Sequence, residues 1–203
     1  MARPAEGRQP AAPMSNSQAA RRVRILRAAS ELGAREGLAS VQMHDVAKEA
    51  GVAIATLYRY FPSKPYLFLA VLEWYIEQFL GDRDPVGAAG EPADPASEVA
   101  ETLAALTGKL LETPLLASAV ALSSFTEYAG TASAGIDVVE GALGQRLLHL
   151  LGGHDEDAAA DCSRVRLLVY SWWGLFVGAL TQELTTEQAG ADLRLAVRLI
   201  LAP

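Results

Sequence analysis

The sequence predicts an all-α protein of about nine helices, and three features of the chain support this fold class. Apolar residues recur at helical spacing, as at Ile25, Ala29 and Leu32, and no stretch shows the period-two alternation of a strand. A capping residue directly before a proline, as at Asp94-Pro95 and Thr113-Pro114, marks helix starts. With 203 residues, 51% hydrophobic and 20% charged, the chain can bury a core.

The front of the chain is predicted to hold an arm, three helices and the start of a longer one. Prolines, glycine and serines make residues 1–18 a flexible arm. Gly37 is expected to end the first helix, Ser40 to cap the second, Gly51 to supply a turn and Ser63 to cap the fourth helix. The expected helices cover about residues 19–36, 42–50, 53–61 and 64–80.

The rest of the chain is predicted to form a larger helical domain over residues 66–203, after a compact domain over residues 19–65. Prolines and glycines over residues 81–95 predict a loop. The pattern Thr185-x-x-Gln188 predicts a capping box for the last helix. The expected rear helices cover about residues 95–111, 114–128, 136–150, 157–184 and 186–201.

The net charge of −7 is distributed unevenly. Residues 1–64 hold ten Lys and Arg against five Asp and Glu, a charge of +5, so the remainder carries −12. A basic front suggests a polyanionic partner. The single cysteine, Cys162, excludes an internal disulfide framework. Residues 1–18 lack the apolar core of a signal peptide and the longest apolar run, residues 167–180, is short for a membrane span, so we expect a cytoplasmic protein without membrane contact.

Two short predicted helices separated by a glycine lie inside the basic front, as in a helix-turn-helix. Ala47 permits close packing of the two helices, and Val46, Val52 and Leu57 fill the small core between them. The side chains left on the outer surface and the N-terminal half of the second helix are Ile54, Ala55, Thr56, Tyr58, Arg59 and Tyr60.

Over about residues 22–69 the sequence closely resembles the TetR family of bacterial one-component transcriptional regulators. The resemblance is carried by Val46-Ala47-Lys48-Glu49-Ala50-Gly51-Val52, by Thr56-Leu57-Tyr58-Arg59-Tyr60-Phe61, and by Ser63-Lys64 with Leu67-Phe68. It implies a three-helix DNA-binding domain, a larger helical domain for ligand binding and dimerisation, and a homodimer that represses from a palindromic operator until a small molecule releases it. Ala53 departs from the small polar residue that many relatives carry there.

The stretch of residues 58–64 is similar to the branch of the family that governs sterol and lipid catabolism in actinobacteria. That similarity favours a bulky apolar or acyl-CoA effector.

The residue chemistry of the front domain favours double-stranded DNA as the partner. Arg59 has the reach for guanine edges or a phosphate, Ile54 for a thymine methyl group, and Thr56 for a base edge or a phosphate. The competing interpretation of Arg59 is a solvated surface charge. The further predicted contacts are Arg22, Gln42, His44 and Ala55, with an exposed helix start as the alternative for His44.

Tyr58 and Tyr60 are predicted as phosphate anchors, because a phenol at the lip of a groove offers a donor on a rigid ring. The alternative is packing against the first helix, above all for Tyr60. Lys64 matches a family position that contacts the DNA backbone, and a helix start favours an anion there. The alternative for Lys64 is again a surface charge.

The helix expected over residues 157–184 is apolar on most of its surface, so it needs partners on several sides. Gly174 and Gly178 allow another helix to come close. With the last helix, it predicts a four-helix bundle between two subunits, the alternative being that Trp172 and Trp173 belong to the core of one chain. The predicted dimer contacts are Trp172, Leu175, Ala179, Leu193, Val197 and Ile200.

A ligand pocket is expected within the helices of residues 66–180, with Ser123, Ser124, Thr126 or Glu127 as polar anchors. The alternative is that most of the apolar candidates merely form the core. The predicted lining residues are Trp74, Leu103, Leu106, Leu110, Leu122, Phe125, Tyr128, Val169 and Trp173.

Two other function classes compete with a regulator. A helical carrier of small molecules would share the rear domain but lack specific DNA binding. An enzyme has little support, since no catalytic residue and no cofactor are predicted and Cys162 has no histidine to pair with it. Acidic residues after His154 suit a helix start better than a metal site, so no metal is expected.

Overall fold

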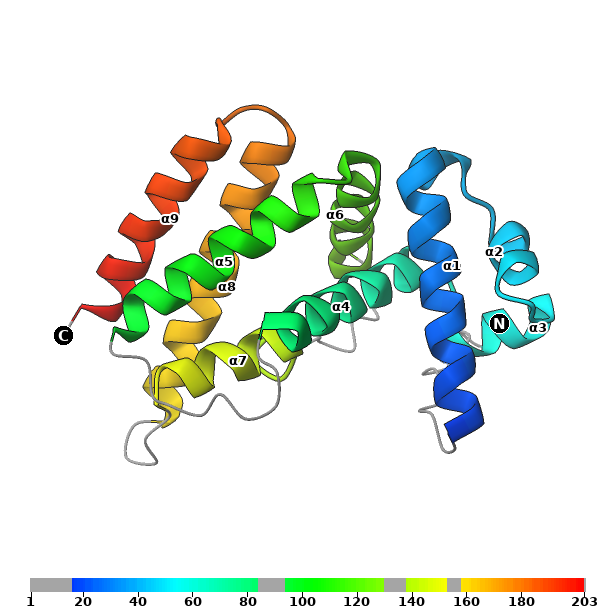
Figure 1. Ribbon diagram of the computed structural model, residues 1–203, viewed down its shortest axis with the longest axis horizontal. Coiled ribbons are helices and arrows are strands. Elements are labelled where there is room, and N and C mark those ends of the chain that lie inside the picture. Colours follow the sequence, from blue (N-terminus) through cyan, green and yellow to red (C-terminus); the bar gives the residue numbers. More distant parts are fainter. Residues whose placement is uncertain (1–15, 84–93, 130–137, 153–157, 203) are drawn as a thin grey trace, which may run out of the picture. The chain divides into compact units, whose positions relative to one another are not determined.

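The computed structural model describes residues 16–83, 94–129, 138–152 and 158–202. These residues form nine α-helices and no strand (Figure 1), which confirms the all-α prediction. Most of the predicted N-terminal arm lies outside the described residues.

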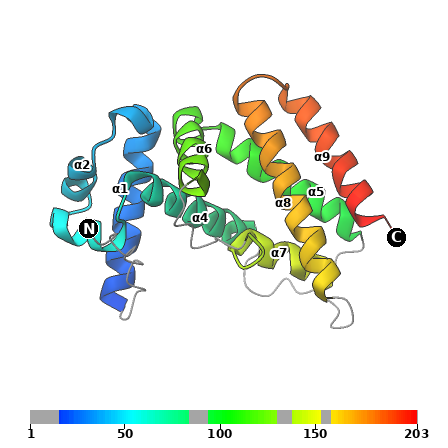
Figure 2. The same ribbon diagram turned by 180° about the vertical axis from the view of Figure 1, so that it is seen from behind.

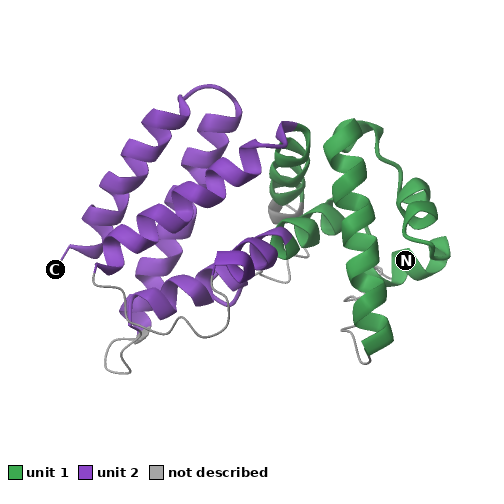
Figure 3. Ribbon diagram, in the orientation of Figure 1, with its two compact units in different colours: residues 1–74, 115–134 green, residues 75–114, 135–203 purple. Residues whose placement is uncertain are grey.

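The chain divides into two compact units (Figure 3). Unit 1 comprises residues 1–74 and 115–134, and unit 2 comprises residues 75–114 and 135–203. The chain passes between the units at residues 74/75, inside the fourth helix, and at residues 114/115, at the start of the sixth helix. The sequence instead predicted a domain boundary at residue 65.

Unit 1 contains the three front helices, the first half of the long fourth helix and the sixth helix. Its helices are α1 (Asn16–Ser40), α2 (Met43–Glu49), α3 (Ile54–Tyr60), α4 (Lys64–Arg83) as far as residue 74, and α6 (Pro114–Ala129) from residue 115. The amide of Tyr66 donates to Ser63 Oγ at 3.0 Å, so the predicted cap of α4 is confirmed.

The junction between α1 and α2 differs from the prediction. Gly37 interrupts α1 with φ of 72°, but the chain continues through one more turn to Ser40. The N-cap position of α2 is therefore Gln42, whose side chain makes no capping bond, and the predicted Ser40 cap is wrong. Gly51, with φ of 62°, supplies the turn before α3 as predicted, in a conformation that glycine adopts without strain.

The core of unit 1 lies between α1, α3, α4 and α6. Leu26, Leu57 and Phe68 are fully buried there. A Cβ atom at Gly33 would lie 2.6 Å from Phe68 Cε1 and 3.1 Å from Leu116 Cδ1. The absence of a side chain at Gly33 therefore lets α4 and α6 pack closely against α1.

Unit 2 contains the second half of α4 and four further helices. They are α5 (Pro95–Leu111), α7 (Ala142–Leu150), α8 (Ala158–Leu180) and α9 (Thr186–Leu201). Both α8 and α5 pack against α9, as Figures 1 and 2 show from opposite sides. The predicted capping box is confirmed, because Gln188 N donates to Thr185 Oγ1 at 3.1 Å and Thr185 N donates to Gln188 Oε1 at 2.9 Å.

Two helices of unit 2 are shorter than the sequence predicted. The described part of the chain forms a turn near residue 139 before α7 begins at Ala142. The second helix, α8, ends at Leu180 because Gln182, two residues later, takes a positive φ of 62°. The chain then folds back so that the Leu184 side chain lies over Gly178, where a Cβ atom would be only 3.0 Å away.

The core of unit 2 is built around Trp172. Its indole Nε1 donates to Thr107 Oγ1 at 2.9 Å, and its ring stacks on Phe176 with centroids 6.0 Å apart. Trp172, Leu193 and Val197 are each at most 2% exposed within the single chain. The sequence assigned these three residues to a contact with a second subunit, and their burial places them in the core of one chain instead.

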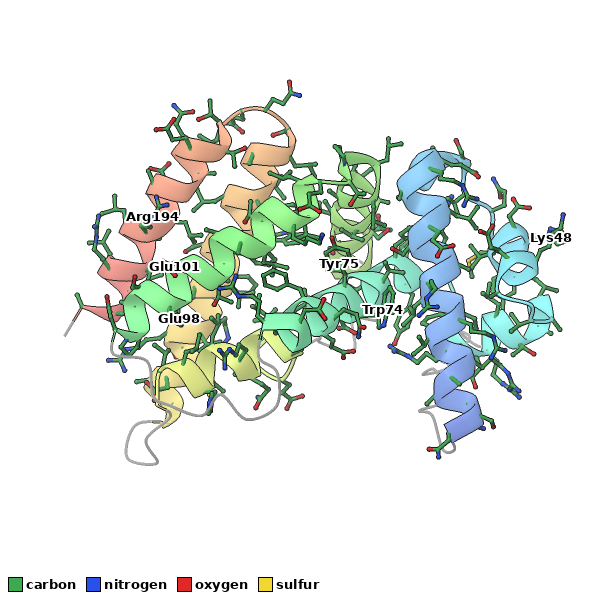
Figure 4. All side chains as sticks on the ribbon, viewed as in Figure 1. Lys48, Trp74, Tyr75, Glu98, Glu101 and Arg194 are labelled. Carbon is green, nitrogen blue, oxygen red and sulfur yellow. The ribbon has the colours of Figure 1, made fainter. Side chains whose placement is uncertain are left out.

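The second half of α4 is tied to the end of α5. Tyr75, labelled in Figure 4, donates its hydroxyl to the Lys109 carbonyl at 3.0 Å, which satisfies an acceptor that the end of a helix leaves open. Burial raises the pKa of Tyr75.

No single described helix is long and apolar enough to cross a membrane, and α5 with α6 meets that test only as a pair bent by 111°.

Candidate nucleic-acid interface

The outer face of α3 is a compact set of exposed side chains on a firmly held helix. Leu57 is fully buried and fixes α3 in unit 1. On the opposite side Ile54 is 39% exposed and Tyr58 is 49% exposed. Ala55 and Arg59 are exposed beside them, and Thr56 is half-buried. The helix therefore presents the predicted face to a partner.

Tyr60 does not belong to this face. It is 4% exposed, and its ring centroid lies 6.3 Å from that of Phe61. The Tyr60 ring is thus packed inside the protein next to Phe61, and a phosphate contact of its hydroxyl stays a prediction. The Arg59 guanidinium lies 5.8 Å from the centroid of the same ring, at the C-terminal end of α3.

Lys64 has a structural partner that the sequence did not reveal. Its Nζ donates to the carbonyls of Leu38 at 2.7 Å and Val41 at 3.0 Å. These carbonyls lie at the end of α1 and just after it, where a positive charge is favourable. The ammonium group therefore joins the start of α4 to the turn between α1 and α2, rather than standing free for a DNA backbone.

Three arginines of α1 hold the front helices together. The Arg22 guanidinium lies over the Phe61 ring, 5.8 Å from its centroid. This predicted DNA contact therefore also has a partner within the chain. Arg24 Nε donates to the Ala50 carbonyl at 3.4 Å. Arg35 donates two hydrogen bonds of 3.4 Å to the Glu49 carboxylate, and these bonds raise the pKa of Arg35.

Polar side chains on α2 extend the exposed surface. Gln42 and His44 are exposed, and His44 Nδ1 lies 3.6 Å from Asp45. Lys48, labelled in Figure 4, is exposed, and its side chain has no hydrogen bond or ion pair within the described ranges. Lys48 was not among the predicted DNA contacts, although a basic residue outside the apolar positions of α2 indicates an exposed charge.

A second exposed face runs along α8 and α9 in unit 2, and it is apolar. On α8 it carries Leu167 at 55% exposure, Tyr170 at 56%, and Gly174, which follow one another at helical spacing. On α9 it carries Leu195 at 47% exposure and Leu199 at 69%. The four large side chains were not among the predicted dimer contacts, whereas Gly174 was expected to let another helix come close. Of the predicted contacts, Leu175, Ala179 and Ile200 are half-buried.

The predicted pocket residues are divided between the two units. In unit 1, Trp74 is half-buried and Leu122 and Phe125 are more than half exposed, while the side chain of Tyr128 lies outside the description. In unit 2, the apolar candidates belong to α5 and α8, where Trp173 is half-buried and the others are buried. These others are Leu103, Leu106, Leu110 and Val169. Their role in ligand binding stays a prediction.

One cavity of about 230 Å³ lies within unit 2, between α5, α8 and α9. Trp172 and Phe176 line it, and Glu187 and Arg194 add charge. Its volume is below the range of roughly 300–1,000 Å³ that is typical of ligand pockets. We therefore do not assign the effector to it.

Within the described residues, no group of three or more His, Cys, Asp or Glu could hold a metal ion. The segment from His154 to Asp157 lies outside the description, and nearby Asp161 is paired with Arg164 at 2.9 Å.

Comparison with known proteins identifies the family. Residues 25–71 match the bacterial regulatory proteins of the tetR family, and residues 93–200 match the tetracyclin repressor-like C-terminal domain. The chain is 32% identical over 187 residues to the HTH-type transcriptional repressor KstR of Rhodococcus jostii, covering 92% of this chain and 85% of that protein. It is 29% identical to KstR of Mycobacterium tuberculosis, covering 92% and 83%.

The structural comparison agrees with the sequence comparison. A crystal structure of a TetR transcriptional regulator from Rhodococcus sp. RHA1 superimposes with a TM-score of 0.77 at 36% identity, covering 92% of this chain and 98% of that one. The family predicted from the motifs of residues 46–68 is thereby confirmed, and the chain belongs to the TetR family of bacterial transcriptional regulators.

Proposed function

We propose that this chain is a repressor that binds a palindromic operator as a homodimer and leaves it when a small, apolar effector binds. The observation that carries the proposal is the exposed face of α3, whose opposite face is buried through Leu57, next to an α2 whose end is bonded to Arg24 and Arg35 of α1. The relatives named KstR are transcriptional repressors, which supports the same role here. A regulator of this kind is not an enzyme and acts in the cytoplasm.

The proposed DNA surface combines base-reading and phosphate-binding side chains. Ile54, Ala55, Thr56, Tyr58 and Arg59 of α3 meet the major groove. The proposed phosphate contacts are Gln42 at the N-cap of α2, His44 and Lys48 on α2, and Arg22 on α1.

The apolar face of α8 and α9 is the proposed contact between two subunits. Large exposed apolar side chains on both helices are typical of an interaction surface, and Gly174 leaves open space around its position. Two such pairs of helices would form a four-helix bundle. A dimer can place its two copies of α3 in major grooves roughly 34–36 Å apart, which one short helix cannot do.

The effector is proposed to bind among the predicted lining residues of unit 2, which lie on α5 and α8. Burial of Leu103, Leu106 and Leu110 in α5 gives this region the apolar character that a lipid-like molecule requires. The similarity of residues 58–64 to the sterol and lipid branch of the family points to the same chemistry.

The experiment that tests this function measures binding to the DNA upstream of the chain's own gene in rising salt. A repressor prefers that fragment over a random duplex and loses affinity steeply as salt rises. Arg59→Ala should weaken binding to the preferred fragment at least about fivefold, with an unchanged melting temperature. Arg198→Ala, an exposed arginine on α9, is the matched control. Equal, feeble binding to both duplexes would favour a small-molecule carrier instead.

A further inference from the structure

We propose that the N-terminal half of α3 reads the 5-methyl group of pyrimidines, so that thymine methyl groups set the sequence preference of this chain. The inference deepens the proposed function and rests on it. It names the feature of DNA that the exposed residues can recognise, and it assigns Ile54 as the side chain that determines the preference.

The first exposed residues of α3 cannot read bases by hydrogen bonding. Ala53, Ile54 and Ala55 are all exposed, and none of them carries a polar side-chain atom. Ile54 keeps 39% of its surface exposed, whereas the other large aliphatic side chains of α2 and α3 are buried. The side chain of Leu57 occupies the opposite, buried face, so α3 cannot turn to present different residues.

The hydrogen-bonding side chains of α3 lie further along the helix. Thr56 is half-buried, and the Arg59 guanidinium sits over the Tyr60 ring at 5.8 Å. Tyr58, one turn after Ile54, adds a ring that is 49% exposed. Apart from the half-buried Thr56, the donors and acceptors thus lie in the C-terminal half of α3, and the exposed side chains of residues 53–55 offer only apolar surface.

The position of this apolar surface decides what it can bind. In a helix-turn-helix, the N-terminal residues of the recognition helix contact base edges in the major groove. The thymine methyl group is the apolar feature that ordinary base pairs present in that groove, because the other edges carry donors and acceptors. Apolar side chains against those polar edges would leave them unpaired, at a cost. The small side chains of Ala53 and Ala55 let the helix come close enough for Ile54 to reach a methyl group.

The test uses the full-length chain and duplexes that it selects from a random pool. Each thymine of the selected duplex is replaced by deoxyuridine, which removes the methyl group and keeps every hydrogen bond. We expect at least one thymine per half-site where this change lowers affinity about fourfold, and roughly fifteenfold when both half-sites are changed. At the same positions, 5-methylcytosine should bind more tightly than cytosine.

Variants of Ile54, with a variant of Lys48 as the control, separate recognition of the methyl group from overall affinity for DNA. Ile54→Ala should bring the thymine-to-deoxyuridine ratio close to one, and Ile54→Val should reduce it partly. Lys48→Gln, on α2, should weaken both duplexes by the same factor. Deoxyuridine tolerated at every position with undiminished affinity would overturn this inference and leave the repressor proposal standing. A pool that yields no preferred duplex would overturn both.

Discussion

Two neighbouring serines of α6 differ in what their buried hydroxyl groups contact. Ser124 Oγ donates to the Val120 carbonyl at 2.9 Å, whereas Ser123 Oγ, fully buried, has no hydrogen-bond partner among the described residues. An unpaired buried hydroxyl costs about 1–3 kcal/mol, while a satisfied one does not. Both serines were predicted as polar anchors for a ligand, and only Ser123 has its hydroxyl available for that role.

Ser123→Ala should therefore raise the free energy of unfolding by about 1 kcal/mol. Ser124→Ala should lower it slightly, because that change removes a formed hydrogen bond. Urea unfolding of the two variants beside the parent protein measures both effects. A loss of stability in Ser123→Ala as large as that in Ser124→Ala would show that the Ser123 hydroxyl finds a partner in solution.

Lys64 makes a prediction that separates a structural role from DNA contact. Lys64→Met keeps the aliphatic stem but leaves the Leu38 and Val41 carbonyls without their donor, which should cost about 1–3 kcal/mol of unfolding free energy. Lys48→Met, at an exposed lysine without such contacts, is the control and should leave stability unchanged. Unchanged stability in Lys64→Met, with weaker DNA binding, would restore the backbone contact that the family resemblance implied.

At the scale of elements, α8 has an inner face and an outer face that should respond differently to a charge. Trp172→Glu buries a carboxylate in the core of unit 2 and removes the bond to Thr107, so the protein should lose its cooperative unfolding transition. Tyr170→Glu changes a side chain that is 56% exposed, so it should yield folded monomers.

Sedimentation velocity and circular dichroism distinguish these two outcomes. Leu199→Glu on α9 should behave like Tyr170→Glu, since its side chain is 69% exposed on the same proposed contact. A folded dimer in both exposed variants would remove this face from the subunit interface.

The sequence predicted the helices well where short-range contacts decide their ends. Ser63, Gly51 and the pair Thr185 with Gln188 act within three residues of the position that they fix, so the pattern alone was sufficient. The Ser40 cap failed because one further turn follows Gly37, and that turn depends on packing around residue 41, which is buried.

The sequence could not predict which stripe of α8 faces outward. This helix is apolar around most of its circumference, so helical spacing offers two plausible inner faces. The choice depends on Thr107, 65 residues away, whose hydroxyl accepts from Trp172. The contacts of Tyr60 with Phe61 and of Lys64 with the Leu38 and Val41 carbonyls could not be predicted either, because side chains that look free in the sequence find partners only in the folded chain.

At the scale of the whole molecule, α4 runs without a break from Lys64 to Arg83 and belongs to unit 1 up to residue 74 and to unit 2 beyond it. The proposed operator-binding unit and the proposed effector-binding unit therefore share one helix, α4. If both ligands act on one equilibrium between two states of the dimer, their binding free energies must be coupled by the same amount in both directions.

An effector should therefore weaken operator binding by the same factor by which the operator weakens effector binding, and typical coupling gives about 5–150-fold. Calorimetric titration of the effector with and without the selected duplex measures one direction, and titration of the duplex with and without effector measures the other. The effector should also raise the melting temperature, because it binds the folded state. A molecule that raises the melting temperature and leaves the duplex affinity unchanged is not the effector, because a ligand with equal affinity for both states of the dimer does not shift the equilibrium between them.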